Sequence, residues 1–177
     1  MTTEDAWRVR KNVALPLLAH CLCCLTKQRD VEGHPTLGII RPASITRLRI
    51  SPADPPDWTE AQLSMLRQQH FFAEAPKQEL QKIPLIFRYE FRCPEDTCPG
   101  HRLMCTDWEI GQSYRQWEAT YGDEWEDKFR QRYESEMIDK NDTHFYVGTV
   151  ASHPNRWIII GLFYPPREAP STQGLLF

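Results

Sequence analysis

Four residues with metal-binding side chains lie close together in the sequence: Cys93, Cys98, His101 and Cys105. Thiolates and neutral imidazoles are ligands that zinc prefers, and four of them close a tetrahedral site that has no open position. Residues 98–101 have the two-residue gap of a zinc knuckle, and Gly100 permits the positive φ that such a turn often needs. The spacing therefore predicts a structural zinc site built from these four side chains.

A second run of soft ligands comprises His20, Cys21, Cys23 and Cys24. If the run is a strand, neighbouring residues point to opposite faces, so at most half of the run could converge on one metal ion. Buried free cysteine is the commoner fate of such residues. One member of the run could nevertheless replace Cys105 or His101 as a zinc ligand.

Several carboxylates near the cysteine cluster suggest an alternative, enzymatic reading. Glu90, Asp107 and Glu109, together with His101, could bind a divalent ion and activate water for phosphodiester hydrolysis. However, Asp107 and Glu109 are also explained as first-turn helix residues, and Glu90 lies between two arginines with which it can pair. The sequence has no Gly-rich phosphate loop, GxSxG elbow, HExxH motif or kinase signature. A metal-dependent nuclease or related hydrolase is therefore the second hypothesis.

Arginines recur on the polar face of two expected strands and near their ends. They are Arg41, Arg47, Arg49, Arg88, Arg92 and Arg102. If the strands are neighbours, these guanidinium groups form a patch that can contact phosphates, and nearby Trp or Tyr rings can stack on unpaired bases. A solvated sheet face with Arg–Glu pairs is the more ordinary interpretation.

Alternating apolar and polar residues predict strands over residues 39–50 and 83–92. Two further apolar runs, residues 145–150 and 157–164, predict a hairpin closed by a four- or five-residue turn at residues 152–155. The apolar run 13–25 fits either a buried strand or a short buried helix, and residues 26–35 fit a polar loop.

Capping signals locate the helices. The pattern Thr59 to Gln62 predicts a helix from Thr59 to about residue 72, and Thr106 with Glu109 has the same capping-box spacing, which predicts a helix starting at residue 107. After Gly122, a second helix is expected because four large apolar residues recur at i+4: Trp125, Phe129, Tyr133 and Met137.

This element order predicts an α+β fold: an antiparallel or mixed β-sheet with about three helices on one side and a zinc-knuckle-like loop between a strand and a helix. The length of 177 residues, with 41% hydrophobic residues, predicts one zinc-stabilised domain over residues 1–166 and a C-terminal tail over residues 167–177.

Charge and cysteine content restrict the function classes. The net charge is −3, with 14 basic and 12 acidic residues in 1–105 against 7 basic and 12 acidic in 106–177. The pI of about 6.1 argues against a binder driven by global charge. Six cysteines without an export signal, and no apolar run of about 20 residues, predict a cytoplasmic protein with reduced thiols or metal ligands and no membrane span. We therefore expect a non-enzymatic, zinc-stabilised binding or scaffold module that acts in a protein assembly or, alternatively, with nucleic acid.

Overall fold

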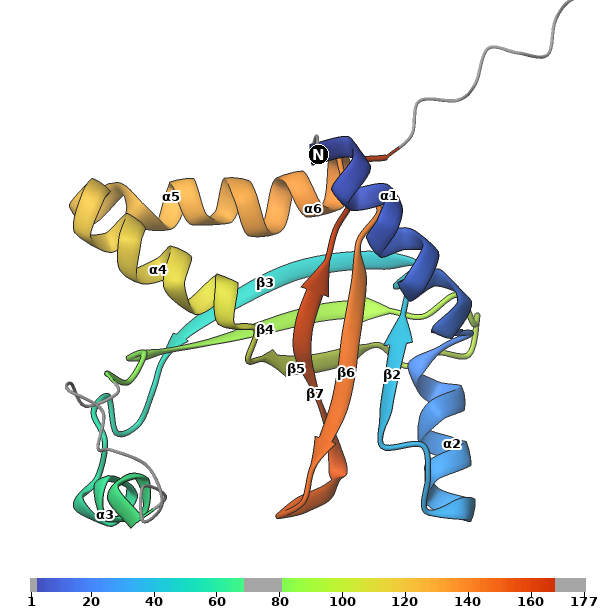
Figure 1. Cartoon of the computed structure of the whole chain (residues 1–177), viewed down its shortest axis with the longest axis horizontal. Coiled ribbons are helices and arrows are strands. Elements are labelled where there is room, and N and C mark those ends of the chain that lie inside the picture. The colour runs from blue at the N-terminus through green and yellow to red at the C-terminus, as the bar shows by residue number, and fades with distance from the viewer. Residues whose placement is uncertain (1–2, 69–80, 168–177) are drawn as a thin grey trace, which may run out of the picture.

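The computed structural model describes residues 3–68 and 81–167 and contains a seven-stranded mixed sheet with helices packed around it (Figure 1). The α-helices are α1 (Thr3–Ala14), α2 (Leu22–Glu32), α3 (Glu60–Gln68), α4 (Trp108–Tyr121), α5 (Trp125–Arg130) and α6 (Glu136–Asp139). The strands are β1 (Leu18–Ala19), β2 (Leu37–Ile40), β3 (Ser44–Pro52), β4 (Leu85–Arg92), β5 (His101–Cys105), β6 (His144–Val150) and β7 (His153–Phe163). The predicted α+β class is confirmed.

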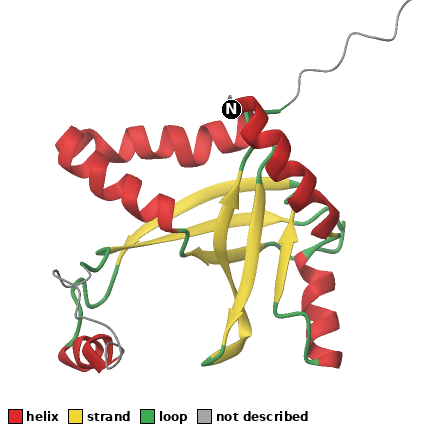
Figure 2. Ribbon diagram, viewed as in Figure 1, coloured by secondary structure: helices red, strands yellow, loops and turns green. Residues whose placement is uncertain are grey.

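The sheet has the order β1-β2-β6-β7-β5-β4-β3 and consists of two mainly antiparallel groups, with the short strand β1 parallel to β2 at one edge. In one group β3, β4 and β5 follow one another as antiparallel neighbours, and in the other β2 pairs with the β6–β7 hairpin. A short parallel contact, in which Cys105 lies beside Ile159, joins the two groups. Figure 2 shows that the β3–β5 group runs steeply across the direction of β6 and β7. Because the sheet is strongly twisted, the two strand groups face in different directions.

One face of β4 forms the centre of the core, as its alternation predicted. Phe87, Tyr89 and Phe91 are buried, and the Phe87 ring stacks on Phe129 of α5 with centroids 5.0 Å apart. The Tyr89 hydroxyl donates to the carbonyl oxygen of Tyr133 at 2.7 Å. Phe129, Tyr133 and Met137 are buried at their i+4 spacing along α5, the π-helical turn Gln131–Ser135 and α6. The helices α4, α5 and α6 therefore cover one face of the β3–β5 group.

Three strand predictions need correction. The run 39–50 is not one strand, because the chain leaves the sheet at Pro42, and the resulting strands β2 and β3 lie far apart in the strand order. The β6–β7 turn has only two residues, since Val150 pairs with His153 across a register shift. Residues 101–105 form the extra strand β5, between residues 93–100, which we call the cysteine loop, and α4.

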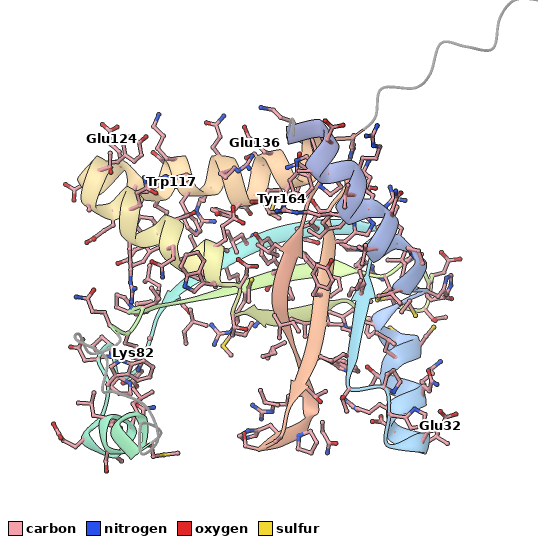
Figure 3. The ribbon with its side chains drawn as sticks, in the orientation of Figure 1. Glu32, Lys82, Trp117, Glu124, Glu136 and Tyr164 are labelled. Carbon is pink, nitrogen blue, oxygen red and sulfur yellow. The ribbon has the colours of Figure 1, made fainter. Side chains whose placement is uncertain are left out.

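The N-terminal apolar run contains three short elements instead of one. It includes the end of α1, the 3₁₀ turn Leu15–Leu17, the two-residue strand β1 and the first turns of α2. Residues 26–32, which were expected to be loop, continue α2 until Gly33, whose φ of 76° ends the helix. Glu32, the last residue of α2, is labelled in Figure 3.

The helix predicted from Thr59 is confirmed at its start, since Thr59 and Gln62 exchange the two capping-box hydrogen bonds at 3.0 and 3.3 Å. Its predicted end, near residue 72, and residues 168–177 of the predicted tail lie outside the described residues. The last described residue, Arg167, donates to the carbonyl oxygens of Ile138 and Asn141. Within the described ranges, none of the helices has the length and apolar character needed to cross a membrane.

The opposite face of the sheet is only partly covered. Trp7 and Ala14 of α1 pack there against Ile39 and Phe163, so α1 covers the part of the sheet formed by β2, β6 and β7. Figure 1 shows α1 crossing the ends of these strands. On the β3–β5 group, the same face carries mainly arginine side chains, which are described below.

Candidate metal centre and arginine face

Four donor atoms converge where the start of α2 meets the loop between β4 and β5. One donor atom each from Cys23, Cys93, Cys98 and His101 lies within 4.8 Å of the other three. His101 Nε2 is 3.2 Å from Cys23 Sγ and 3.4 Å from Cys98 Sγ. Three sulfurs and one imidazole nitrogen are a donor set of the kind that closes structural zinc sites. The cluster can therefore hold a metal ion.

The cysteine loop is shaped by bonds to the sulfur and the carbonyl of Cys98. The backbone amides of Cys93 and Gly100 point at Cys98 Sγ at 3.3 and 3.4 Å, as in a zinc knuckle. Gly100 has φ of 86°, which a residue with a Cβ adopts only at a cost. The Arg92 guanidinium donates to the Cys98 carbonyl oxygen at 2.6 Å. These contacts hold the turn in place without a metal ion.

Helix α2 brings the remaining ligand. Cys21 caps the helix, Leu22 is buried in the core, and Cys23 lies one residue further along, facing the cysteine loop. Packing of Leu22 and Leu25 against the sheet core therefore sets the position of Cys23. A metal bound here would connect the N-terminal helix region to the β4–β5 hairpin.

The environment changes the proton affinity of each donor. Burial, with the neighbouring Cys93 and Cys98 thiols, raises the pKa of Cys23 to about 12. Burial also raises the pKa of Cys93, against the effect of the Cys23 and Leu22 amides. At Cys98 burial raises the pKa, but the amides of Cys93 and Gly100 outweigh it and the net pKa is lowered. Burial lowers the pKa of His101, which favours the neutral imidazole that ligates metals.

Cys23 takes the place that the sequence analysis gave to Cys105. Because residues 101–105 form a strand and not a loop, Cys105 lies four residues along β5 from His101, a distance of about 13 Å. There it pairs with Phe87 on β4 and Ile159 on β7, and burial raises its pKa to about 12. It behaves as a small core residue. The sequence feature that indicated Cys23 as a possible ligand was the run of histidine and cysteine at residues 20–24.

The proposed catalytic carboxylates are occupied by structural contacts and belong to neither potential metal group found among the described residues. Asp107 caps α4, since its Oδ1 accepts from the Ile110 amide at 3.1 Å, and its Oδ2 accepts from the Leu162 amide of β7 at 3.0 Å. Glu109 accepts from the Tyr164 hydroxyl at 2.8 Å. Tyr164 is labelled in Figure 3, beside the end of β7.

The cap itself differs from the predicted one. The Thr106 hydroxyl donates to the Ile159 carbonyl oxygen instead of accepting an amide of α4, and Asp107 is the N-cap. The helix nevertheless starts within one residue of the predicted position. The capping box failed because β7 offers Thr106 and Asp107 partners that are distant in the sequence.

Five of the six nominated arginines share the open face of β3, β4 and β5, which we call the arginine face: Arg47, Arg49, Arg88, Arg92 and Arg102. Glu90 lies at its centre, opposite Arg47 on β3 and Arg102 on β5. Its carboxylate accepts from the guanidinium groups of Arg49 and Arg102, which lower the pKa of Glu90. Arg88 donates to the Ser51 hydroxyl at 2.9 Å. Part of the predicted Arg–Glu pairing is therefore present.

Arg41 does not belong to the arginine face. It lies in the link between β2 and β3 and forms an ion pair with Asp142 at 2.7 Å. With Arg167 it lines a separate hollow near the end of α6. Its position on a connecting loop, not on the strand, separates it from the other five.

Residues 19–177 match the family model described as "Domain of unknown function (DUF8757)". Because the match spans most of the chain and includes all donors of the metal cluster, the chain belongs to this family. Neither the curated proteins nor the solved structures include a significant match.

Proposed function

We propose that this protein is an intracellular, zinc-stabilised binding module that contacts the phosphate backbone of a nucleic acid through its arginine face. The observation that carries the proposal is the direct pairing of Arg49 with Arg88 on adjacent strands. Like charges opposite each other in a β-ladder are destabilising. A polyanionic partner offsets that repulsion, so the arrangement is better suited to binding than to folding.

The balance of charge on the arginine face supports this choice. Five guanidinium groups surround one carboxylate, Glu90, which gives the face a formal charge of +4 although the whole chain is acidic. The exposed fractions of the Arg49 and Arg102 side chains are 45% and 59%. Guanidinium donors that are exposed and only partly paired can bind phosphate oxygens in the bidentate geometry that arginine favours.

The metal cluster supports the arginine face from beneath. A hollow of about 410 Å³ in this face is lined by Arg49, Arg92 and Arg102 and also by Gly100 of the cysteine loop and His101 at the start of β5. Arg92 is held by the Cys98 carbonyl oxygen. A zinc ion that fixes this loop would therefore also fix two of the five arginines, Arg92 and Arg102.

The arginine face is tested by reversing two of its charges. Arg47→Glu with Arg88→Glu should abolish binding to single-stranded or duplex oligonucleotides at low salt. The melting temperature should stay within a few degrees, because substitution of the exposed Arg47 usually costs under about 0.5 kcal/mol and the half-buried Arg88 loses one hydrogen bond, to Ser51, worth about 1 kcal/mol. In the parent protein, raising the salt concentration should weaken binding, as counterion release requires. Fluorescence anisotropy with labelled RNA and DNA measures both effects.

The matched control reverses two basic residues remote from the arginine face, Arg8→Glu and Lys140→Glu, which lie on α1 and after α6. Both side chains are well exposed, at 74% and 66%. This control changes the net charge by the same amount and should retain binding. If the parent protein binds neither RNA nor DNA at low salt, the nucleic-acid proposal is wrong and the partner is a protein.

The zinc site is tested with two cysteine variants that separate the two ligand assignments. Cys23→Ser should lose the tightly held zinc that copurifies with the protein, and Cys105→Ala should retain it. Cys98→Ser should also lose zinc and several kcal/mol of stability, because the binding energy of a structural zinc is folding energy. Elemental analysis and melting curves measure these outcomes. Zinc loss in Cys105→Ala together with retention in Cys23→Ser would refute the ligand set.

The contacts do not favour the hydrolase hypothesis. A catalytic metal needs an open coordination position, whereas the donor set of Cys23, Cys93, Cys98 and His101 is complete at four. The three nominated carboxylates already bind arginines, backbone amides or a tyrosine hydroxyl.

A further inference from the structure

A second group of metal-binding atoms lies at the beginning of α2 and shares no residue with the first group. Donor atoms of Cys21, Cys24 and Glu95 lie within 4.8 Å of one another. Cys21 and Cys24 are three residues apart, which places them on one side of the first helical turn. Glu95 belongs to the cysteine loop. The start of α2 and the cysteine loop therefore contribute donor atoms to this group as well as to the first.

Cys21 occupies a position that usually has an oxygen ligand for the helix amides. It is the N-cap of α2, where Ser, Thr, Asp and Asn are preferred, and its Sγ accepts from the Cys24 amide at 3.0 Å. The residue is buried, with an exposed fraction of 1%. The positive end of the helix favours the negative charge that a metal-bound thiolate carries. Capping explains Cys21 but not why a thiol and a carboxylate gather around its sulfur.

Two members of this group, Cys24 and Glu95, are accessible to solvent. Cys24 is an exposed cysteine, whereas Cys21, Cys93, Cys98 and Cys105 are buried and Cys23 is half-buried. The Glu95 side chain is 41% exposed, and its carboxylate contacts Nε2 of His20, whose side chain is 69% exposed. The Glu95 backbone carbonyl accepts from the Cys98 amide at 2.9 Å, so Glu95 is held by the loop that carries the first group.

We infer a second metal site in which Cys21, Cys24 and Glu95 bind a zinc ion, with His20 orienting the Glu95 carboxylate. Two sulfurs and one carboxylate oxygen are all donors that zinc accepts, and three protein ligands leave one position for water or an exchanging ligand. Carboxylates that ligate a metal are themselves hydrogen-bonded by outer groups, and the contact of His20 with Glu95 is of this kind. The two groups share no ligand, so each can be removed by substitution without deleting a ligand of the other.

The two sites should differ in how fast they release zinc. The first has four protein ligands, two of them fully buried cysteines, whereas the second has three ligands and faces solvent. The parent protein should therefore bind two zinc ions per chain, one released rapidly to a colorimetric chelator and one released slowly. The probe is zinc(II) alone, added to the full-length protein and followed by elemental analysis and by the kinetics of chelator transfer.

Two variants remove the second site without removing the helix start. In Cys21→Ser the hydroxyl still caps α2, since serine is a preferred N-cap residue, but the thiolate is lost. Cys24→Ser changes an exposed side chain, for which the cost to stability is usually within about 0.5 kcal/mol. Each variant should bind one zinc ion per chain, lose the rapid phase entirely and keep the slow phase. Circular dichroism checks that both variants remain folded.

The results that overturn the inference are distinct from those that overturn the first site. A parent protein that binds one zinc ion per chain, lost in Cys23→Ser but kept in Cys21→Ser and Cys24→Ser, has the first site and not the second. Retention of two ions in both Cys21→Ser and Cys24→Ser would also refute the inference. If Cys24→Ser remains folded but loses both ions, the seven donor residues of the two groups form one joint centre and the second site is not separate.

Discussion

Removal of the Asp107 side chain tests whether this carboxylate is structural. Asp107→Ala deletes the N-cap of α4, which typically costs about 0.5 to 2 kcal/mol. It also leaves the Leu162 amide of β7 without its acceptor, and an unsatisfied, partly buried donor costs about 1 to 3 kcal/mol. The expected loss is therefore about 1.5 to 5 kcal/mol. For a chain of this length each kcal/mol shifts the melting temperature by about 2 to 4 °C, which gives a decrease of about 3 to 20 °C.

Thermal and urea unfolding of three variants measure this prediction. Asp107→Asn should fall between the parent and Asp107→Ala, because one amide oxygen can still accept the Ile110 amide while the amide nitrogen cannot accept from Leu162. Thr106→Ala is the control, since it removes only one bond, at 3.2 Å, from an exposed residue and should cost about 0.5 kcal/mol or less. A larger loss in Thr106→Ala than in Asp107→Ala would show that Thr106 is the cap and refute the reasoning. A parent nuclease activity abolished by Asp107→Asn without loss of stability would instead favour catalysis.

Four further outcomes are expected. Removal of the metal with a chelator should lower the melting temperature and speed amide hydrogen exchange in α2, because the cluster ties this helix to the β4–β5 loop; unchanged exchange would contradict the structural role. Tyr89→Phe should cost about 1 to 3 kcal/mol in urea unfolding, because the buried carbonyl of Tyr133 loses its donor. Phe129→Ala should cost about 3 to 5 kcal/mol, since the residue is fully buried, and a smaller loss would mean that α5 can collapse onto the cavity. Glu109→Gln should change stability by less than about 0.5 kcal/mol, because the amide oxygen still accepts from the Tyr164 hydroxyl.

Local patterns were sufficient to predict several elements of the fold. The alternation along β4 identified its buried face, and the i+4 spacing of Phe129, Tyr133 and Met137 identified the stripe of the α5–α6 segment that packs on it. Both predictions depend on period alone, and the period follows from backbone geometry. The start of α3 was also found from sequence because both partners in its capping box lie within one helical turn.

Predictions that depended on partners distant in the sequence were less successful. The apolar residues around Ile40 and Ile45 predicted one continuous strand. In the structure they belong to two strands, β2 and β3, which pair with β6 and β4 in different parts of the sheet. Thr106 has the spacing of a cap, but β7 supplies it with another partner. A short apolar run does not specify its neighbour, because pairing energy comes from strands that can be a hundred residues away.

The metal centre shows the same division. The sequence by itself determined that this chain has zinc-type ligands in a knuckle, that Cys93, Cys98 and His101 share it, and that arginines line the polar face of two strands. Only the tertiary structure decided the fourth donor. Residues 101–105 extend as a strand and carry Cys105 into the core. Packing of Leu22 at the start of α2 places Cys23 beside His101 of the knuckle, 78 residues away in the sequence. Ligand type follows from side-chain chemistry, but ligand identity requires convergence in space, which is set by the packing of the core.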